Sequence, residues 1–137
     1  MDSHPNPTDR ELEILKILWD RKEATVREVY EQLSDKLGIV QNTVQAFLRT
    51  MEQKDLVEHR LEGRTFIYRP KVGKDATSRS LVSRLLHRVF DGAMDELVQS
   101  ALSVRPPKQD ELANLDDLIE HHKSSKSKSS NALKGKK

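Results

Sequence analysis

The spacing of apolar residues changes once within the first 70 residues, and this change limits the folds open to the chain. Up to about residue 55, apolar residues recur every three or four positions, which predicts helices. Two capping boxes, Thr8–Glu11 and Thr25–Glu28, mark helix starts. We therefore expect helices over about residues 8–20, 25–38 and 41–55, with Gly38 ending the second.

After residue 55 the pattern becomes alternating, which predicts strands. We expect strands over residues 56–61 and 65–69, a turn around Glu62-Gly63, and a stop at Pro70. Helices followed by a hairpin are the arrangement of a winged helix-turn-helix, in which the hairpin is the wing. The sequence therefore predicts a mostly α fold with a small β-hairpin: a flexible N-terminus over residues 1–7 and a winged helix-turn-helix domain over residues 8–70.

A second helical region is expected after a connector at residues 71–77. Helical apolar spacing runs from Ser78 to about Val104 with a bend or break at Gly92, and a last helix follows near residues 108–122. Two or three helices alone make a thin core. The simplest solution is that residues 78–122 pack against the same segment of a second copy, which predicts a two-fold dimer. The residues expected at the dimer interface are apolar: Leu81, Leu85, Val89, Phe90, Leu97, Val98, Ala101, Leu102, Leu115, Leu118 and Ile119.

The formal net charge of +2 is unevenly distributed. Residues 1–70 hold 11 Lys or Arg against 13 Asp or Glu, and residues 71–122 hold 7 against 9. Residues 123–137 hold 6 lysines and no acid, and we expect this tail to be disordered. It can either add affinity for DNA of any sequence or keep the protein in solution. The body is weakly acidic, so any case for nucleic-acid binding must rest on where individual charges lie.

The outer face of the third predicted helix carries no carboxylate, although one-third of the chain is charged. Asn42 and Gln45 can each pair with adenine, Arg49 with guanine, and the Ala46 methyl can touch a thymine methyl. Thr43 lies on the flank, where its hydroxyl would meet phosphate, and Lys54 and Arg64 are placed for backbone or minor-groove contact, with Arg60 a weaker candidate. This pattern favours a recognition helix in the major groove of double-stranded DNA.

Two other interpretations of this helix face remain open. It can be a solvated helix face that happens to lack acid. It can also bind a partner protein, which would make the domain a winged-helix interaction module without specific DNA binding. The net acidic body favours this alternative, whereas the acid-free face and Arg64 oppose it.

No residue cluster predicts an enzyme. The histidines are scattered, and the sequence has neither a Gly-rich phosphate loop nor a nucleophile–base constellation, so we expect no catalytic residues, no metal site and no cofactor. The absence of cysteine excludes disulfides and thiolate metal sites. With no apolar leader and no membrane-length apolar run, a cytoplasmic protein without membrane insertion is expected.

Two long stretches resemble the penicillinase-repressor family of transcriptional regulators (BlaI/MecI/CopY): TDRELEILKILWDRKEATVREVYEQL and NTVQAFLRTMEQKDLVEHRLEGRTFIYRP. The resemblance covers residues 8 to about 122 and is strongest up to Pro70. It implies a winged-helix repressor that dimerises through its C-terminal helices and binds a dyad-symmetric operator. On matching positions, the resemblance implies that Arg64 lies in the wing and that the recognition helix carries Gln41, Asn42, Thr43, Gln45, Ala46 and Arg49.

Three departures from the family pattern limit what the resemblance implies. Asp55 stands where members usually have glycine. The copper-responsive branch ends in cysteine pairs, which this chain lacks. The β-lactam-responsive branch is inactivated by cleavage at an Asn-Phe bond, which would involve a membrane sensor protease; the matching place here is Ser100-Ala101, so the inducing signal does not transfer.

Overall fold

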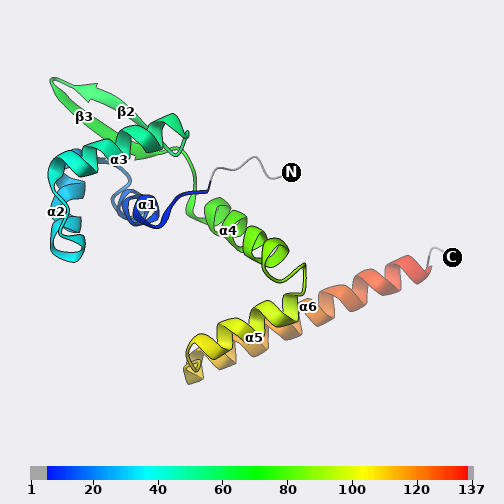
Figure 1. The fold of residues 1–137 in the computed structure, drawn as a ribbon. Coiled ribbons are helices and arrows are strands. Elements are labelled where there is room, and N and C mark those ends of the chain that lie inside the picture. Colours follow the sequence, from blue (N-terminus) through cyan, green and yellow to red (C-terminus); the bar gives the residue numbers. More distant parts are fainter. Residues whose placement is uncertain (1–5, 136–137) are drawn as a thin grey trace. The chain divides into compact units, whose positions relative to one another are not determined.

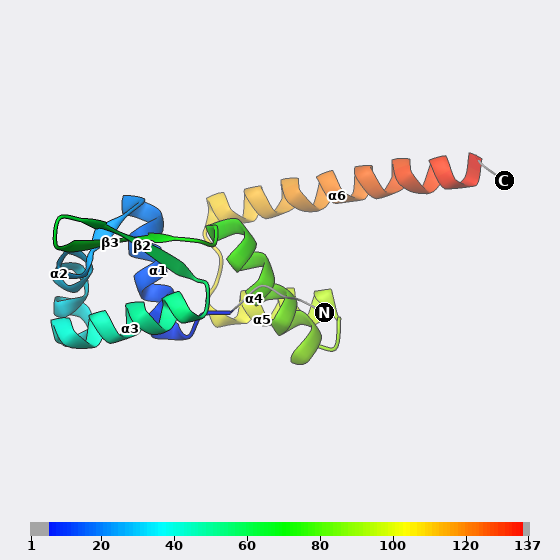
Figure 2. The same ribbon diagram turned by 90° about the horizontal axis from the view of Figure 1, so that it is seen from above.

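A computed structural model describes the backbone of residues 6–135 and the side chains of residues 6–125. The chain forms two compact units, Met1–Asp91 and Gly92–Lys137 (Figures 1 and 2). In chain order the first unit holds α1 (Asp9–Arg21), β1 (Ala24–Thr25), α2 (Val26–Leu37), α3 (Gln41–Gln53), β2 (Val57–Glu62), β3 (Thr65–Pro70) and α4 (Lys74–Arg88). The second unit holds α5 (Met94–Val104) and α6 (Gln109–Gly135).

The first three helices begin and end close to where the sequence predicts. Both capping boxes are confirmed: Thr8 Oγ accepts from the Glu11 amide at 3.3 Å, and the matching bond from the Glu28 amide to Thr25 Oγ is 3.1 Å. Gly38 adopts a φ of +63° at the end of α2, a conformation that glycine takes without steric cost. Local capping and termination chemistry therefore account for these helix ends.

The predicted hairpin is present, and a third strand joins it. The sheet has the antiparallel order β1-β3-β2, and β1 pairs through Ala24 with Tyr68 and through Thr25 with Ile67. A strand of two residues is too short to give an alternating signal, so the sequence pattern does not predict it. Its effect is to join the α1–α2 connection to the wing.

The core of the first unit lies where the helices meet the sheet. Most of the apolar stripe of α3 is buried: Val44, Leu48 and Met51 are each 0% exposed, and Phe47 packs partly buried against the core. Trp19 packs partly buried at the edge of this core and donates its indole N–H to the Val72 carbonyl at 2.9 Å. Burial of one α3 stripe leaves the opposite side of the helix at the surface.

The long helical pattern over residues 78–104 divides into two helices. Asp91 and Gly92 have φ angles of +51° and +87°, which no α-helix can contain. The predicted break at Gly92 is therefore confirmed. The predicted connector over residues 71–77 is too long, because α4 already begins at Lys74, directly after its cap Gly73.

Both ends of the chain are described only in part. Asn6 is tied down, because its Oδ1 accepts from Ser80 Oγ at 2.8 Å, while residues 1–5 lie outside the described part. The tail predicted to be disordered from Lys123 is helical through Gly135, and residues 136–137 lie outside the description. Lysine is a good helix former, and neither Gly nor Pro interrupts the segment before Gly135.

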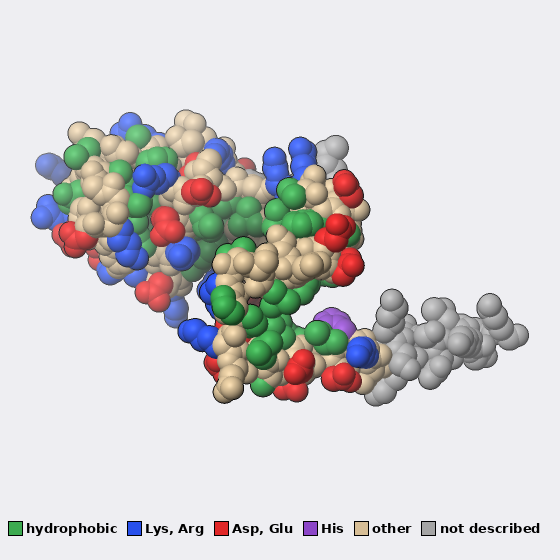
Figure 3. All heavy atoms as spheres, turned by 60° about the horizontal axis from the view of Figure 1, so that its bottom comes forward, with side chains coloured by type: hydrophobic (Ala, Val, Ile, Leu, Met, Phe, Trp, Pro, Cys, Tyr) green, Lys and Arg blue, Asp and Glu red, His purple; other side chains and the backbone are tan. Residues whose placement is uncertain are grey.

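The second unit is an apolar helix pair with little buried surface of its own. No residue of α5 is buried, and Val98, Leu102 and Leu118 are 41%, 42% and 55% exposed. An open apolar hollow lies between α5 and α6, and Figure 3 shows apolar side chains gathered on this unit. At its rim Arg105 bonds both carboxylate oxygens of Glu111 at 2.8 Å, which lowers the pKa of Glu111 to about 2, helped by the Lys108 amide. Within residues 6–135, no helix is long and apolar enough for a bilayer crossing.

A buried carboxylate connects the start of α1 to the end of α3. Glu11 is 2% exposed, and its two oxygens accept from Lys54 Nζ at 2.9 and 3.0 Å. Burial alone would raise the pKa of Glu11, but the Thr8 amide and the hydrogen bonds and charge of Lys54 outweigh it, so the pKa lies below its ordinary value. The ionised carboxylate is thus a structural element of the fold.

Replacing Glu11 by Gln should make stability less sensitive to acid. A carboxyl whose pKa is lowered on folding stabilises the native state above its unfolded pKa, about 4.3, and loses that contribution as the pH falls through its folded pKa. We expect Glu11→Gln to lower the free energy of unfolding by on the order of 1–3 kcal/mol at neutral pH, with the difference shrinking below about pH 4.5. Urea titrations across pH measure it. The exposed neighbour change Glu13→Gln is the control, and an equal pH dependence in both variants would contradict the assignment.

Asp55 occupies a backbone conformation that favours glycine. Its φ is +62°, directly after α3, and its only ion pair within residues 6–125 is an exposed contact of 3.4 Å with Lys71. We expect Asp55→Gly to raise the free energy of unfolding by roughly 1 kcal/mol by removing strain, and Asp55→Ala to lower it. Chemical denaturation of the three proteins tests this. Equal stability of the Gly and Ala variants would show that the backbone is not strained there.

Candidate nucleic-acid interface

The surface of α3 presents the residues that the sequence analysis selected. Gln41, Asn42, Ala46 and Arg49 are exposed, while Thr43 and Gln45 are half-buried on the flanks. The one carboxylate of α3 is Glu52, which is bonded to His59 of β2. The helix therefore offers amides, a methyl and a guanidinium without a free acid.

The N-terminus of α3 is unlike those of the other helices in the described chain. Each of the other five has Asp or Glu in its first turn, whereas α3 has none, and no side chain caps it from Val40. A helix N-terminus carries partial positive charge and free N–H groups, which acids usually satisfy. At α3 neither an acid in the first turn nor the side chain of Val40 fills this role, so an acceptor outside the chain, such as a phosphate, can do so.

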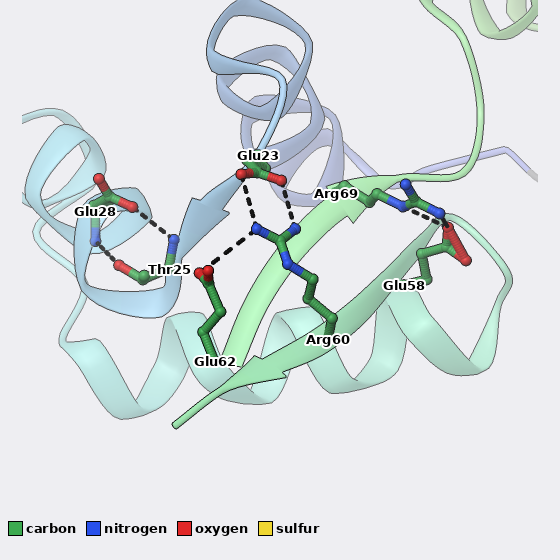
Figure 4. A network of polar contacts seen from close by, with 7 residues as sticks. All are labelled: Glu23, Thr25, Glu28, Glu58, Arg60, Glu62 and Arg69. Carbon is green, nitrogen blue, oxygen red and sulfur yellow. Dashed lines mark hydrogen bonds and ion pairs between the residues drawn. The ribbon is translucent and has the colours of Figure 1, made fainter. Parts of the chain in front are cut away.

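The outer face of the sheet is rich in charge, but its cations are paired (Figure 4). Arg60 bonds Glu23 at 2.6 and 3.0 Å and lies 3.6 Å from Glu62, while Arg69 bonds Glu58 at 2.7 Å. The hydrogen bonds from Arg60 lower the pKa of Glu23. These arginines are therefore neutralised by neighbouring carboxylates: Glu58 and Glu62 on β2, and Glu23 just before β1.

Arg49 and Arg64 differ from the sheet arginines. Within residues 6–125, neither forms a hydrogen bond or an ion pair, and both are exposed. Arg64 lies in the turn between β2 and β3, at the tip of the wing. These two guanidiniums keep their full capacity to bind an external anion.

Lys54 has a different setting from the one the sequence suggested. It was expected to face DNA, but its ammonium is bonded to buried Glu11 and only 39% of its side chain is exposed. The sequence showed Glu11 as part of a capping box, and nothing in the spacing connected it with Lys54, 43 residues away. A DNA contact by Lys54 remains a prediction, and it would have to share the ammonium with Glu11.

Exposed apolar side chains next to this face escaped the sequence analysis. Val40 is 62% exposed before α3, and Leu61 and Phe66 are 59% and 37% exposed. Leu61 and Phe66 are direct cross-strand partners, so they share one face of the hairpin. Strand alternation past the edge of the core was the signal that could have identified them.

The residues predicted to dimerise lie at or near the surface of the described chain. Leu85, Val89, Val98, Ala101, Leu102, Leu118 and Ile119 are exposed, and Leu81, Phe90, Leu97 and Leu115 are half-buried. Ser100 and Ala101, the place matched to regulatory cleavage, are exposed in the middle of α5. The structure contains one copy of the chain, so dimerisation through these residues stays a prediction.

Known proteins with similar sequences include a repressor and a regulatory protein. The penicillinase repressor of Bacillus licheniformis is 27% identical over 126 residues, covering 92% of this chain and 98% of the relative. The methicillin resistance regulatory protein MecI of Staphylococcus aureus is 18% identical over 109 residues, covering 80% of this chain and 89% of the relative.

Similar solved structures include two of the repressor BlaI. The solution structure of its DNA-binding domain is 31% identical, covers 54% of this chain and 90% of that chain, and has a TM-score of 0.48. The monomeric form of BlaI from Bacillus licheniformis in complex with the blaP half-operator is also 31% identical, covers 55% and 92%, and has the same TM-score. The family model described as penicillinase repressor matches residues 7–121. The chain therefore belongs to the penicillinase repressor family.

Proposed function

We propose that this protein is a DNA-binding transcriptional repressor that acts as a homodimer on a dyad-symmetric operator. The observation that carries the proposal is the exposed, acid-free face of α3, whose N-terminus has no acid in its first turn and no side-chain cap from Val40. Membership of a family whose relatives include a penicillinase repressor supports it. The body of the chain is weakly acidic, so this local arrangement must supply the attraction for DNA.

Each α3 would lie in a major groove with its N-terminus toward the backbone. Asn42 and Gln45 would pair with adenine edges, Arg49 with guanine, and Ala46 would touch a thymine methyl. Gln41 and Thr43, near the uncapped end, would contact phosphates. Arg64 would reach the backbone or minor groove from the wing, as arginine side chains of other minor-groove-binding proteins do.

Two copies would be joined through the apolar surfaces of the C-terminal helices. Exposed contiguous apolar surface of this kind marks an interaction site in most proteins. A two-fold axis then repeats the half-sites about one helical turn, ~34–36 Å, or a multiple of it apart. If repression is relieved by proteolysis, as the resemblance implies for the β-lactam-responsive branch, the exposed Ser100-Ala101 bond is the matching place for a sensor protease.

The second candidate is a winged-helix protein-interaction module. Val40, Leu61 and Phe66 favour it, because they are apolar and exposed beside α3. Selection from a randomised duplex library, using the full chain at raised salt to suppress sequence-blind binding, distinguishes the two functions. An enriched palindrome supports the repressor, whereas a folded protein that enriches no sequence would favour the interaction module.

Base-reading residues should affect sequence preference as well as affinity. We expect Arg49→Ala and Asn42→Ala each to cost on the order of 1–3 kcal/mol on the enriched palindrome and to relax the preference at one position per half-site. Lys16→Ala, which removes one exposed positive charge from α1, is the control and should have little effect. An equal loss on all sequences would instead make Arg49 or Asn42 a phosphate contact.

The dimer prediction can be tested on α6 without disturbing the fold. Leu118 is 55% exposed in the single chain, so Leu118→Lys should leave the secondary structure intact. If Leu118 is buried between copies, the change should weaken dimerisation by about 10- to 100-fold, measured by sedimentation equilibrium. Asp117→Lys, on the same helix, is the control. Unchanged dimerisation in the Leu118 variant would place the interface elsewhere.

A further inference from the structure

One contact joins the wing to α3 through a titratable side chain. Nδ1 of His59, in β2, lies 2.8 Å from both carboxylate oxygens of Glu52 in α3. The two side chains are 31% and 34% exposed, so each is partly shielded but still in contact with water. An imidazolium can donate to both oxygens and also neutralise their charge, whereas a neutral imidazole can only donate.

Packing holds the imidazole in place. The ring centroid of His59 lies 4.6 Å from that of Phe66 and 5.5 Å from that of Tyr68, and Tyr68 is its direct cross-strand partner. Tyr68 is buried, which raises its pKa; nearby Glu52 adds to this rise and Arg49 opposes it. Both strands of the wing therefore contribute to the surroundings of one histidine.

The position of Glu52 connects this contact with DNA binding. Residues 45, 49 and 52 follow one another at helical spacing, so Gln45, Arg49 and Glu52 share a flank of α3. A free carboxylate one turn beyond Arg49 would compete for its guanidinium and repel phosphates. A protonated His59 removes that competition while keeping the wing against the helix.

We propose that His59 is a positioning residue that neutralises Glu52 and thereby makes DNA binding dependent on pH. This inference rests on the proposed function. An imidazole gains its charge below about pH 6.5, close to physiological pH. Affinity for DNA should accordingly be higher at pH 6 than at pH 8, because losing the imidazolium leaves Glu52 uncompensated beside the base-reading residues.

The charged groups around the pair are few and can be separated from it. From α3 they are Glu52 and Arg49, and from β3 the titratable neighbour is Tyr68. Glu58 and Arg60 flank His59 along β2, but strand alternation puts them on the other face, where they pair with Arg69 and Glu23. Carboxyl, phenol and guanidinium groups as classes have ordinary pKa values outside pH 6–8, so a scan over this range tests the imidazole of the set.

Binding should be measured on the enriched palindrome between about pH 6 and pH 8 at constant ionic strength. We expect the affinity of the unmodified protein to fall by up to about fivefold over this range, the worth of one exposed ion pair. His59→Gln keeps an N–H donor without the charge, so it should bind with the weak, high-pH affinity throughout. Glu52→Gln should bind with the tight, low-pH affinity throughout. Since the two variants deviate in opposite directions, a general loss of structure would not reproduce the result.

His87→Gln is the matched control, because His87 is exposed on α4 and the same charge is removed. It should retain the pH profile of the unmodified protein. If the His59→Gln profile is also parallel to that of the unmodified protein, the proposal is wrong.

A second measurement does not depend on DNA. In the free protein, hydrogen-exchange protection factors of the β2 and β3 amides should fall from pH 6 to pH 8, but not in Glu52→Gln. If the protein enriched no DNA sequence yet showed this dependence, the proposed function would fail and the pairing would stand. Protection factors independent of pH in the unmodified protein would overturn the pairing as well.

Discussion

The ionised Glu11 carboxylate is the interaction on which the placement of α3 in the first unit depends. It caps the start of α1 through the Thr8 amide and binds the ammonium at the end of α3. A buried carboxylate without these partners would cost several kcal/mol, so the two helices are held in one relation to each other. The burial of Val44, Leu48 and Met51 fixes the rotation of α3 about its own axis, and the ion pair fixes its end.

Because α3 is anchored in this way, its two sides differ. The buried side is apolar and closely packed, as in any core helix. The other side and the N-terminus leave hydrogen-bonding capacity unused, although a helix normally satisfies it with an acid in the first turn. The N-terminus of α3 is therefore less stabilised by its own first turn than those of the other described helices, and a phosphate is the simplest group that would supply the missing acceptor.

Sequence patterns predicted those parts of the fold that depend on local chemistry. The capping boxes, the turn at Gly63 and the break at Gly92 are each set by a few adjacent residues, and the structure has them where expected. Contacts between distant residues were not predictable: β1, the bond from Lys54 to Glu11 and that from His59 to Glu52 depend on how the elements pack. The side chains proposed to read DNA bases could be identified from one helix face. The surroundings of Lys54 and the exposure of Leu61 depend on the three-dimensional packing and could not.

The paired arginines on the outer sheet face have a consequence for how such a protein would search a genome. A genome offers on the order of a million or more non-specific sites that compete for any exposed cation. Since Arg60 and Arg69 are already neutralised by Glu23 and Glu58, they add little to attachment at random sites. If the protein binds an operator as proposed, fewer copies would be held on non-operator DNA, and fewer copies would be needed to keep the operator occupied.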